Sequence, residues 1–128
     1  MRARSGLAPA RGGSIARASV QARAQLQQLV RDLDAVAARL GEVRTETLDD
    51  NTHDRWADAM DAVELALARA DAALQAGPSA LFEREMPTLQ ATLALLADNV
   101  AWQRQDAAVI DAVSRAHTPL SRVIVLGR

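Results

Sequence analysis

A regular seam of apolar residues constrains the fold more than any other feature of the chain. Between residues 26 and 43 an apolar side chain recurs at alternating spacings of three and four residues. This is the heptad pattern of a helix that lies along another helix. With Ser14 as an N-cap, it predicts a first helix from about residue 15 to about residue 44. We expect a partner helix to bind this seam, which comprises Leu26, Leu29, Leu33, Val36, Leu40 and Val43.

A second seam predicts a second helix. Gly77 and Pro78 end this helix, because glycine suits a left-handed C-cap and proline cannot continue a helix. The seam follows the same three-four spacing and comprises Trp56, Met60, Val63, Leu67, Ala70 and Leu74.

A third seam extends from Met86 to Val100, with Ser79 as a possible cap in front of it. Pro87 is expected to kink or split this helix, because the residue before a proline disfavours the helical conformation. Beyond residue 100 the pattern drifts to a neighbouring face that includes Trp102, Val109 and Val113, and Pro119 is expected to end the helix. The predicted fold is an all-α antiparallel bundle of three long helices.

The predicted domain organisation has three parts: a flexible basic arm (1–13), the helical bundle (14–118) and an apolar tail (119–128). The arm contains four glycine or proline residues, which disfavour a helix. The tail carries the β-prone run Val123–Leu126. We expect it to fold back over the bundle as a strap, or to serve as an exposed docking peptide or an edge that pairs with another chain.

Composition agrees with an all-α class. The chain of 128 residues has 28 alanines and only three aromatic residues, and alanine is the best helix former. All 15 basic residues are arginine, which together with the alanine content indicates the codon bias of a GC-rich, bacterial genome. The lack of cysteine excludes disulfides and thiolate chemistry. No apolar run is long enough to span a membrane, so a cytoplasmic location is expected.

Charge is divided unevenly along the chain. Residues 1–31 carry six arginines and no acid, whereas residues 32–128 carry nine arginines and all 16 acids, a net charge of −7. Such a basic segment can contact nucleic acid, an anionic membrane surface or the acidic body, and it also has the composition of a transit peptide. A solvated arm is the simplest interpretation. The arginines of the arm that would bind nucleic acid are Arg2, Arg4, Arg11 and Arg17.

The acid-rich stretch 49–61 is the strongest candidate for a chemical site. Five of its residues match oxygen-ligand positions of a calcium-binding EF-hand loop, but Arg55 stands where the loop requires glycine. His53 with Asp49 and Asp50 would lie on one face of a helix and could bind a transition metal or take part in phosphotransfer. The matching EF-hand positions are Asp50, Thr52, Asp54, Asp58 and Asp61.

The simpler interpretation of this stretch is the start of a helix. Thr47 or Thr52 would cap it, Thr47 and Asp50 would form a capping box, and acids in the first turn would interact with the helix dipole. Met60, Met86 and His117 are ligand types of haem-binding bundles, but methionine on a helical seam is usually part of the core. We therefore predict no catalytic, cofactor-binding or metal-binding residue, and no enzymatic activity.

Residues 65–105 resemble the flagellar export chaperones of the small helical-hairpin type. Those proteins have an alanine- and leucine-rich helix, a turn with glycine and a second amphipathic helix, which implies a function in holding a partner helix. The Gly77–Pro78 pair and Pro87 depart from that pattern. The resemblance rests on Leu74, Gly77, Leu81, Glu83, Leu89, Leu93 and Leu96.

The function expected from these patterns is protein interaction. The chain would act as an adaptor, a chaperone-like protein or a regulator, through helix–helix association with a second copy or a partner protein. The alternative is a small nucleic-acid-associated protein that uses the basic arm, with the bundle as dimeriser. The partner, the oligomeric state and the occupancy of the acidic turn by a cation stay open.

Overall fold

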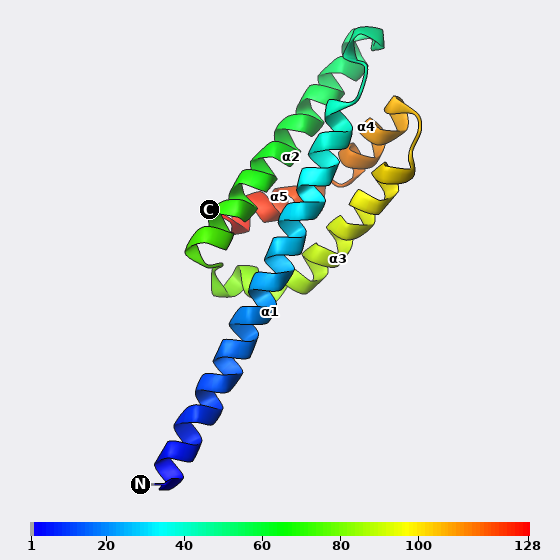
Figure 1. The fold of residues 1–128 in the computed structure, drawn as a ribbon. Coiled ribbons are helices and arrows are strands. Elements are labelled where there is room, and N and C mark those ends of the chain that lie inside the picture. The colour runs from blue at the N-terminus through cyan, green and yellow to red at the C-terminus, as the bar shows by residue number, and fades with distance from the viewer. Residues whose placement is uncertain (1) are drawn as a thin grey trace.

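The computed structural model describes the backbone of residues 2–128 and the side chains of residues 20–128, and over this range the chain forms helices and no strand (Figure 1). The all-α prediction is therefore confirmed, but the prediction of three helices is wrong, because five α-helices are present in this range. The elements are α1 (Arg2–Gly41), the 3₁₀ turn η1 (Thr45–Thr47), α2 (Asp50–Ala76), α3 (Ala80–Trp102), α4 (Asp106–Arg115) and α5 (His117–Leu126).

Three long helices form the frame of the bundle, and two short ones close its back (Figure 1). α1 runs up, α2 returns beside it, and α3 starts below α2, passes behind α1 and then runs up on the other side of α1. α1 packs mainly on α2 and α3, whereas α4 and α5 cover the remaining side of α2 and also contact α3. α2 is thus flanked by α1 on one side and by α4 and α5 on the other.

The buried face of α2 is a row of small residues, and this differs from the predicted seam. Four of the five buried residues of α2 are alanines, so α2 can approach its neighbours closely. The larger predicted seam residues Met60, Leu67 and Leu74 are only half-buried at the edge of the core. The buried row comprises Ala59, Val63, Ala66, Ala70 and Ala73.

Pro87 does not end or split the third helix, since α3 continues through it to Trp102. A proline in a helix interior lacks an N–H, so the carbonyl group of Glu83 loses its main-chain partner. The Pro87 ring is exposed and the neighbouring Met86 is fully buried, so the helix keeps its apolar face on the core through this position. Burial of that face outweighs the local cost of the proline.

The third helix ends instead at residues 103–105, where the sequence has neither glycine nor proline. Arg39 of α1 stabilises this break between α3 and α4. Its Nη2 atom donates to the carbonyl oxygen of Gln103 at 3.2 Å and lies 3.6 Å from the Asp106 carboxylate. The backbone N–H of Arg44 donates to the other Asp106 oxygen at 3.0 Å. Contacts from the end of α1 therefore stabilise the end of α3 and the start of α4.

The C-terminal tail does fold back onto the bundle, but as a helix rather than as an extended strap. Pro119 lies in the first turn of α5, where its missing N–H would have no helical partner anyway, so the prediction that it ends a helix is wrong. Leu120, Val123 and Leu126 bury the inner face of α5. After α5, a Cβ atom on Gly127 would lie 2.7 Å from Cβ of Arg69, so only glycine allows this close contact with α2.

Two further findings concern the predicted arm and the membrane. The backbone of the predicted arm belongs to α1, which begins at Arg2, whereas the side chains of Arg2, Arg4, Arg11 and Arg17 lie outside the described residues. Among the helices of the described residues, none is both long enough and apolar enough to cross a membrane.

The contacts of Arg39 generate a stability prediction. Arg39→Met should lower the free energy of unfolding by about 1–2 kcal/mol, because it removes charge-assisted hydrogen bonds and leaves part-buried Asp106 with one partner fewer. Urea denaturation followed by circular dichroism measures the effect. The matched control is Arg104→Met, an exposed arginine one residue from Gln103, which should change stability by less than about 0.5 kcal/mol. Equal effects of the two substitutions would show that Arg39 does not hold the break.

Candidate functional site

The seam predicted to bind a partner lies inside the bundle. Its four leucines have no exposed surface, and its two valines are also buried. The same heptad spacing that suits a partner helix suits the chain's own α2 and α3, which pack on α1. A partner could reach this seam only by opening the core. The buried set is Leu26, Leu29, Leu33, Val36, Leu40 and Val43.

The acid-rich stretch forms the start of α2, and its cap is Asp49. The Asp49 carboxylate accepts the backbone N–H of Thr52 at 2.7 Å. The predicted Thr47 capping box is wrong, because Thr47 belongs to η1 and its hydroxyl donates to the carbonyl of Arg44. Hydrogen bonds from the Thr52 backbone N–H, and secondarily from its hydroxyl, lower the pKa of the Asp49 carboxyl below its ordinary value. Asp49 is therefore held in its charged form at the positive end of the helix.

Trp56 joins this start of α2 to the end of α1. Its indole Nε1–H donates to the carbonyl oxygen of Leu40 at 2.9 Å, and its ring centroid lies 5.6 Å from that of exposed His53. Asp54, Asp58 and Asp61 are exposed. Across the described residues, no three His, Asp or Glu side chains lie close enough together to hold a metal ion.

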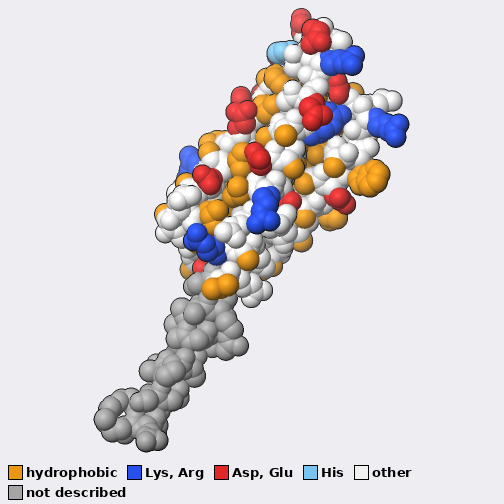
Figure 2. Space-filling model, in the orientation of Figure 1, with side chains coloured by type: hydrophobic (Ala, Val, Ile, Leu, Met, Phe, Trp, Pro, Cys, Tyr) orange, Lys and Arg blue, Asp and Glu red, His pale blue; other side chains and the backbone are white. Residues whose placement is uncertain are grey.

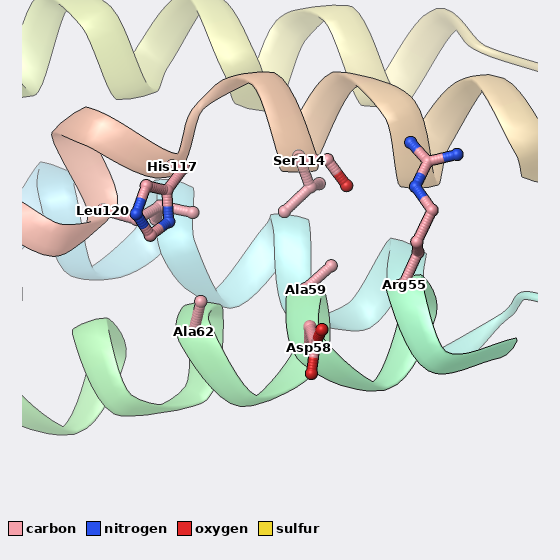
Figure 3. Close-up of a pocket in the computed structure, with 8 residues that line it drawn as sticks. Arg55, Asp58, Ala59, Ala62, Ser114, His117 and Leu120 are labelled. Carbon is pink, nitrogen blue, oxygen red and sulfur yellow. The ribbon is translucent and has the colours of Figure 1, made fainter. Parts of the chain in front are cut away.

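A cleft of about 290 Å³ lies between α2 and the corner where α4 meets α5 (Figure 3). Ala59 and Ala62 form its floor on α2, because their small side chains leave space under the corner. Arg55 pairs with Asp111 of α4 at 3.3 Å near one end of the cleft. The lining residues are Arg55, Asp58, Ala59, Ala62, Val113, Ser114, His117 and Leu120.

The cleft brings a serine, a histidine and an acid to one place, but not in the arrangement of a nucleophilic triad. Ser114 donates its hydroxyl proton to the carbonyl oxygen of Ile110 at 2.8 Å, and in Figure 3 this hydroxyl points away from His117. The His117 ring instead lies 3.4 Å from the hydroxyl of Ser121. Asp58 points out of the cleft (Figure 3). A triad requires a hydrogen bond between its serine and its histidine, and Ser114 and His117 do not form one, because the Ser114 hydroxyl donates to Ile110.

The three possible haem ligands lie in different parts of the molecule. Met86 is fully buried in the core, Met60 lies beside Gly41 at the α1–α2 edge, and His117 lines the cleft on the other flank of α2. These positions do not form a common ligand set.

The sequence interpretation missed an exposed apolar row on α3. Trp102, which the sequence pattern places on the buried face, is 81% exposed, and Leu95 is 71% exposed. Together with Leu81 and Thr88 they stand seven residues apart on the exposed side of α3. The seven-residue spacing of large residues among polar neighbours was the signal that could have revealed it. We call Leu81, Thr88, Leu95 and Trp102 the outer row of α3.

Comparison with protein-family models, curated proteins and solved structures found no match for this chain. The resemblance of residues 65–105 to flagellar export chaperones therefore receives no support from these comparisons. The candidate surfaces are assigned from their own residues.

The Asp49 cap generates a pH prediction. A carboxyl whose pKa is lowered by folding stabilises the fold above its unfolded pKa, and this contribution is lost as the pH falls through the folded pKa. Asp49→Asn keeps an acceptor for the Thr52 N–H but cannot titrate. The difference in Tm between wild type and Asp49→Asn should therefore shrink as the pH falls from about 6 to about 3. A constant difference over this range, measured by thermal circular dichroism, would contradict the assigned role.

Proposed function

We propose that this chain is a non-enzymatic protein-interaction module that binds a helix of another polypeptide along the outer row of α3. The observation that carries the proposal is the exposure of Leu95 and Trp102 on one straight row of a well-packed helix. Tryptophan and leucine at heptad spacing are the anchors of helix–helix recognition. The module would act in the cytoplasm as an adaptor, a chaperone-like protein or a regulator.

The energetics favour a reversible interaction. Burying one exposed large apolar side chain contributes about 1.5–3 kcal/mol. The outer row offers two that are largely exposed, Leu95 and Trp102, and a third, Leu81, that is already more than half covered and contributes less. Association itself costs several kcal/mol in lost translational and rotational freedom. Thr88 and the flanking residues Asp98 and Asn99 make the edges of the row polar. We therefore infer a transient partner rather than an obligate one.

We assign no catalytic role to the cleft between α2 and the α4–α5 corner. The Ser114 proton is committed to the Ile110 carbonyl, and His117 faces Ser121. The ion pairs of Asp111 with Arg55 and Arg115 tie α4 to α2 and to its own last turn. These interactions support a role of the polar groups in holding the short helices in place.

Site-specific photo-crosslinking tests the outer row. Benzoylphenylalanine placed at exposed Ala91, one turn from Leu95, should form an adduct in cells of the native organism, and mass spectrometry should identify the adduct as a second copy or another protein. Trp102→Ala should lower the adduct yield about tenfold or more, because a tryptophan anchor of an interface typically contributes at least about 2 kcal/mol.

The control places the same crosslinker at Ala107, which is exposed on α4. Circular dichroism of Trp102→Ala verifies that the fold is retained, which is expected because the side chain is exposed. Equal yields from Ala91 and Ala107, or a yield that does not depend on Trp102, would rule out the outer row as the binding surface.

A second candidate function, nucleic-acid binding, is favoured by the segregation of charge. Six arginines without a single acid in residues 1–31 provide the electrostatic character that phosphate binding requires. If this function holds, fluorescence anisotropy should detect binding to a DNA duplex at low salt. Replacing Arg2, Arg4, Arg11 and Arg17 with glutamine should make the slope of log K against log salt concentration shallower by about 0.9 for each phosphate that is no longer neutralised. The absence of binding at low salt would exclude it.

A further inference from the structure

The groove between α1 and α2 is lined by two rows of incompletely buried apolar residues. Met60, Leu67 and Leu74 of α2 stand seven residues apart, and Val30 and Ala37 of α1 are also seven residues apart; all are half-buried against the core. Around Val30 and Leu67 the groove has a volume of about 390 Å³. Heptad rows on two adjacent antiparallel helices form the surface on which a third helix packs. Within the described residues this groove holds no such helix.

The rim of the groove is acidic. Asp34 of α1 and Glu64 and Asp71 of α2 line it, and Arg31 is the single base beside them in the described lining. The ion pairs among the described side chains involve other carboxylates, those of Glu85, Asp106 and Asp111. Figure 2 shows acidic, basic and apolar side chains interspersed over the face formed by α1 and α2. A helix that covers the apolar floor would therefore gain from basic side chains along its edges.

The chain itself contains a segment of this chemistry. Residues 1–19 carry four arginines and no acid, and their apolar residues include Leu7 and Ile15. As a helix these residues would span about 27 Å, and the row from Met60 to Leu74 spans about 21 Å, so one segment can cover the groove. α1 is one helix from Arg2 to Gly41, so the chain before Val20 continues along the α1 axis away from its own groove. Only another copy can then supply the segment.

We propose that the groove between α1 and α2 binds the arginine-rich segment, residues 1–19, of a second copy of this chain. The exchange would be reciprocal, as a two-fold dimer requires, so that each copy covers the floor of the other. The arginines meet the acidic rim formed by Asp34, Glu64 and Asp71. This dimer uses a surface distinct from the outer row of α3 and does not depend on the function proposed for that row.

Sedimentation of the full chain tests the dimer and its electrostatic basis. The wild type should dimerise in a concentration-dependent manner, and about 1 M salt should weaken the dimer strongly, since the Debye length then falls to about 3 Å. Two variants should each raise the dissociation constant of the dimer at least tenfold. The first, the triple groove variant, combines Asp34→Asn, Glu64→Gln and Asp71→Asn. The second replaces the four arginines of residues 1–19 with glutamate. Combining the four glutamates with Asp34→Arg, Glu64→Arg and Asp71→Arg should restore the dimer.

Crosslinking locates the contact, and the absence of native cysteine makes it specific. A chain carrying Ala68→Cys on the groove lining is mixed with a differently tagged chain carrying Ala8→Cys, and a short bismaleimide is added. A product between the two tagged chains is expected, and the triple groove variant should abolish it. Ala107→Cys on α4 in place of Ala68→Cys is the matched control, which should give little product.

Several outcomes would overturn the proposal. These are a wild-type chain that stays monomeric at all concentrations, a mixture of the Ala68→Cys and Ala8→Cys chains that gives no more crosslinked product than the Ala107→Cys control, and a dimer that the groove variants do not weaken. A dimer lost in Leu95→Ala and Trp102→Ala but retained in the groove variants would place the interface on α3. In that case the proposed function stands and the groove inference fails. The opposite pattern supports the groove irrespective of the outer row.

Discussion

The close packing of α2 along its row of alanines is the constraint on which the rest of the structure depends. α2 has neighbours on both flanks, α1 on one and α4 with α5 on the other, and it buries Ala59, Ala66, Ala70 and Ala73 between them. Small side chains let helix axes approach closely, but they leave little volume to fill the core. The larger residues of α2 are therefore displaced to the edges, where Met60, Leu67 and Leu74 are only half-buried. Because α2 turns its alanines rather than its larger residues towards the core, it borders an apolar groove on the α1 flank and forms the alanine floor of the cleft on the other flank.

Contacts between distant segments, rather than local breakers, decide where the later helices end. Pro87 lies inside α3 and Pro119 inside α5, whereas α3 ends at a Gln-Arg-Gln stretch that has no intrinsic stop signal. That end is stabilised because Arg39, in the last turns of α1, binds both the freed carbonyl of Gln103 and the Asp106 carboxylate of α4. The turn redirects the chain so that Val109, Ile110 and Val113 cover the side of the bundle that a straight third helix would leave open.

The surfaces available for interaction differ in chemistry. The outer row of α3 combines the most exposed tryptophan and leucine of the described residues with flanking residues of both charges, Arg84 and Asp98, which suits an amphipathic helix without a strong net charge. The α1–α2 groove has an apolar floor and an acidic rim, which suits a basic helix such as the segment at the start of this chain. The regular seam of α1 is unsuited to either role, because the core already occupies it.

Much of the fold was accessible from the sequence, and little of the candidate site was. The seam from Leu26 to Val43, the stop at Gly77–Pro78 and the caps near Ser79 and residue 49 follow from periodicity and local hydrogen bonding, which act within a few residues. The orientation of α2 was not predictable in this way, because Trp56, Met60 and Leu67 formed a more apolar stripe than the alanines that are buried.

By itself, the sequence determined that the chain is helical, that the α1 seam is buried and that the second helix ends at Gly77, because each of these depends on local periodicity or local hydrogen bonding. Only the tertiary structure decided that the α1 seam serves the chain's own core, that Trp102 faces outward, and that residues 103–128 fold as two short helices. Those outcomes depend on which neighbour each face meets, as the contacts of Arg39 with Gln103 and Asp106, far along the chain, show. Heptad spacing marks a face for burial, but the identity of its neighbour is set by the packing of the whole chain.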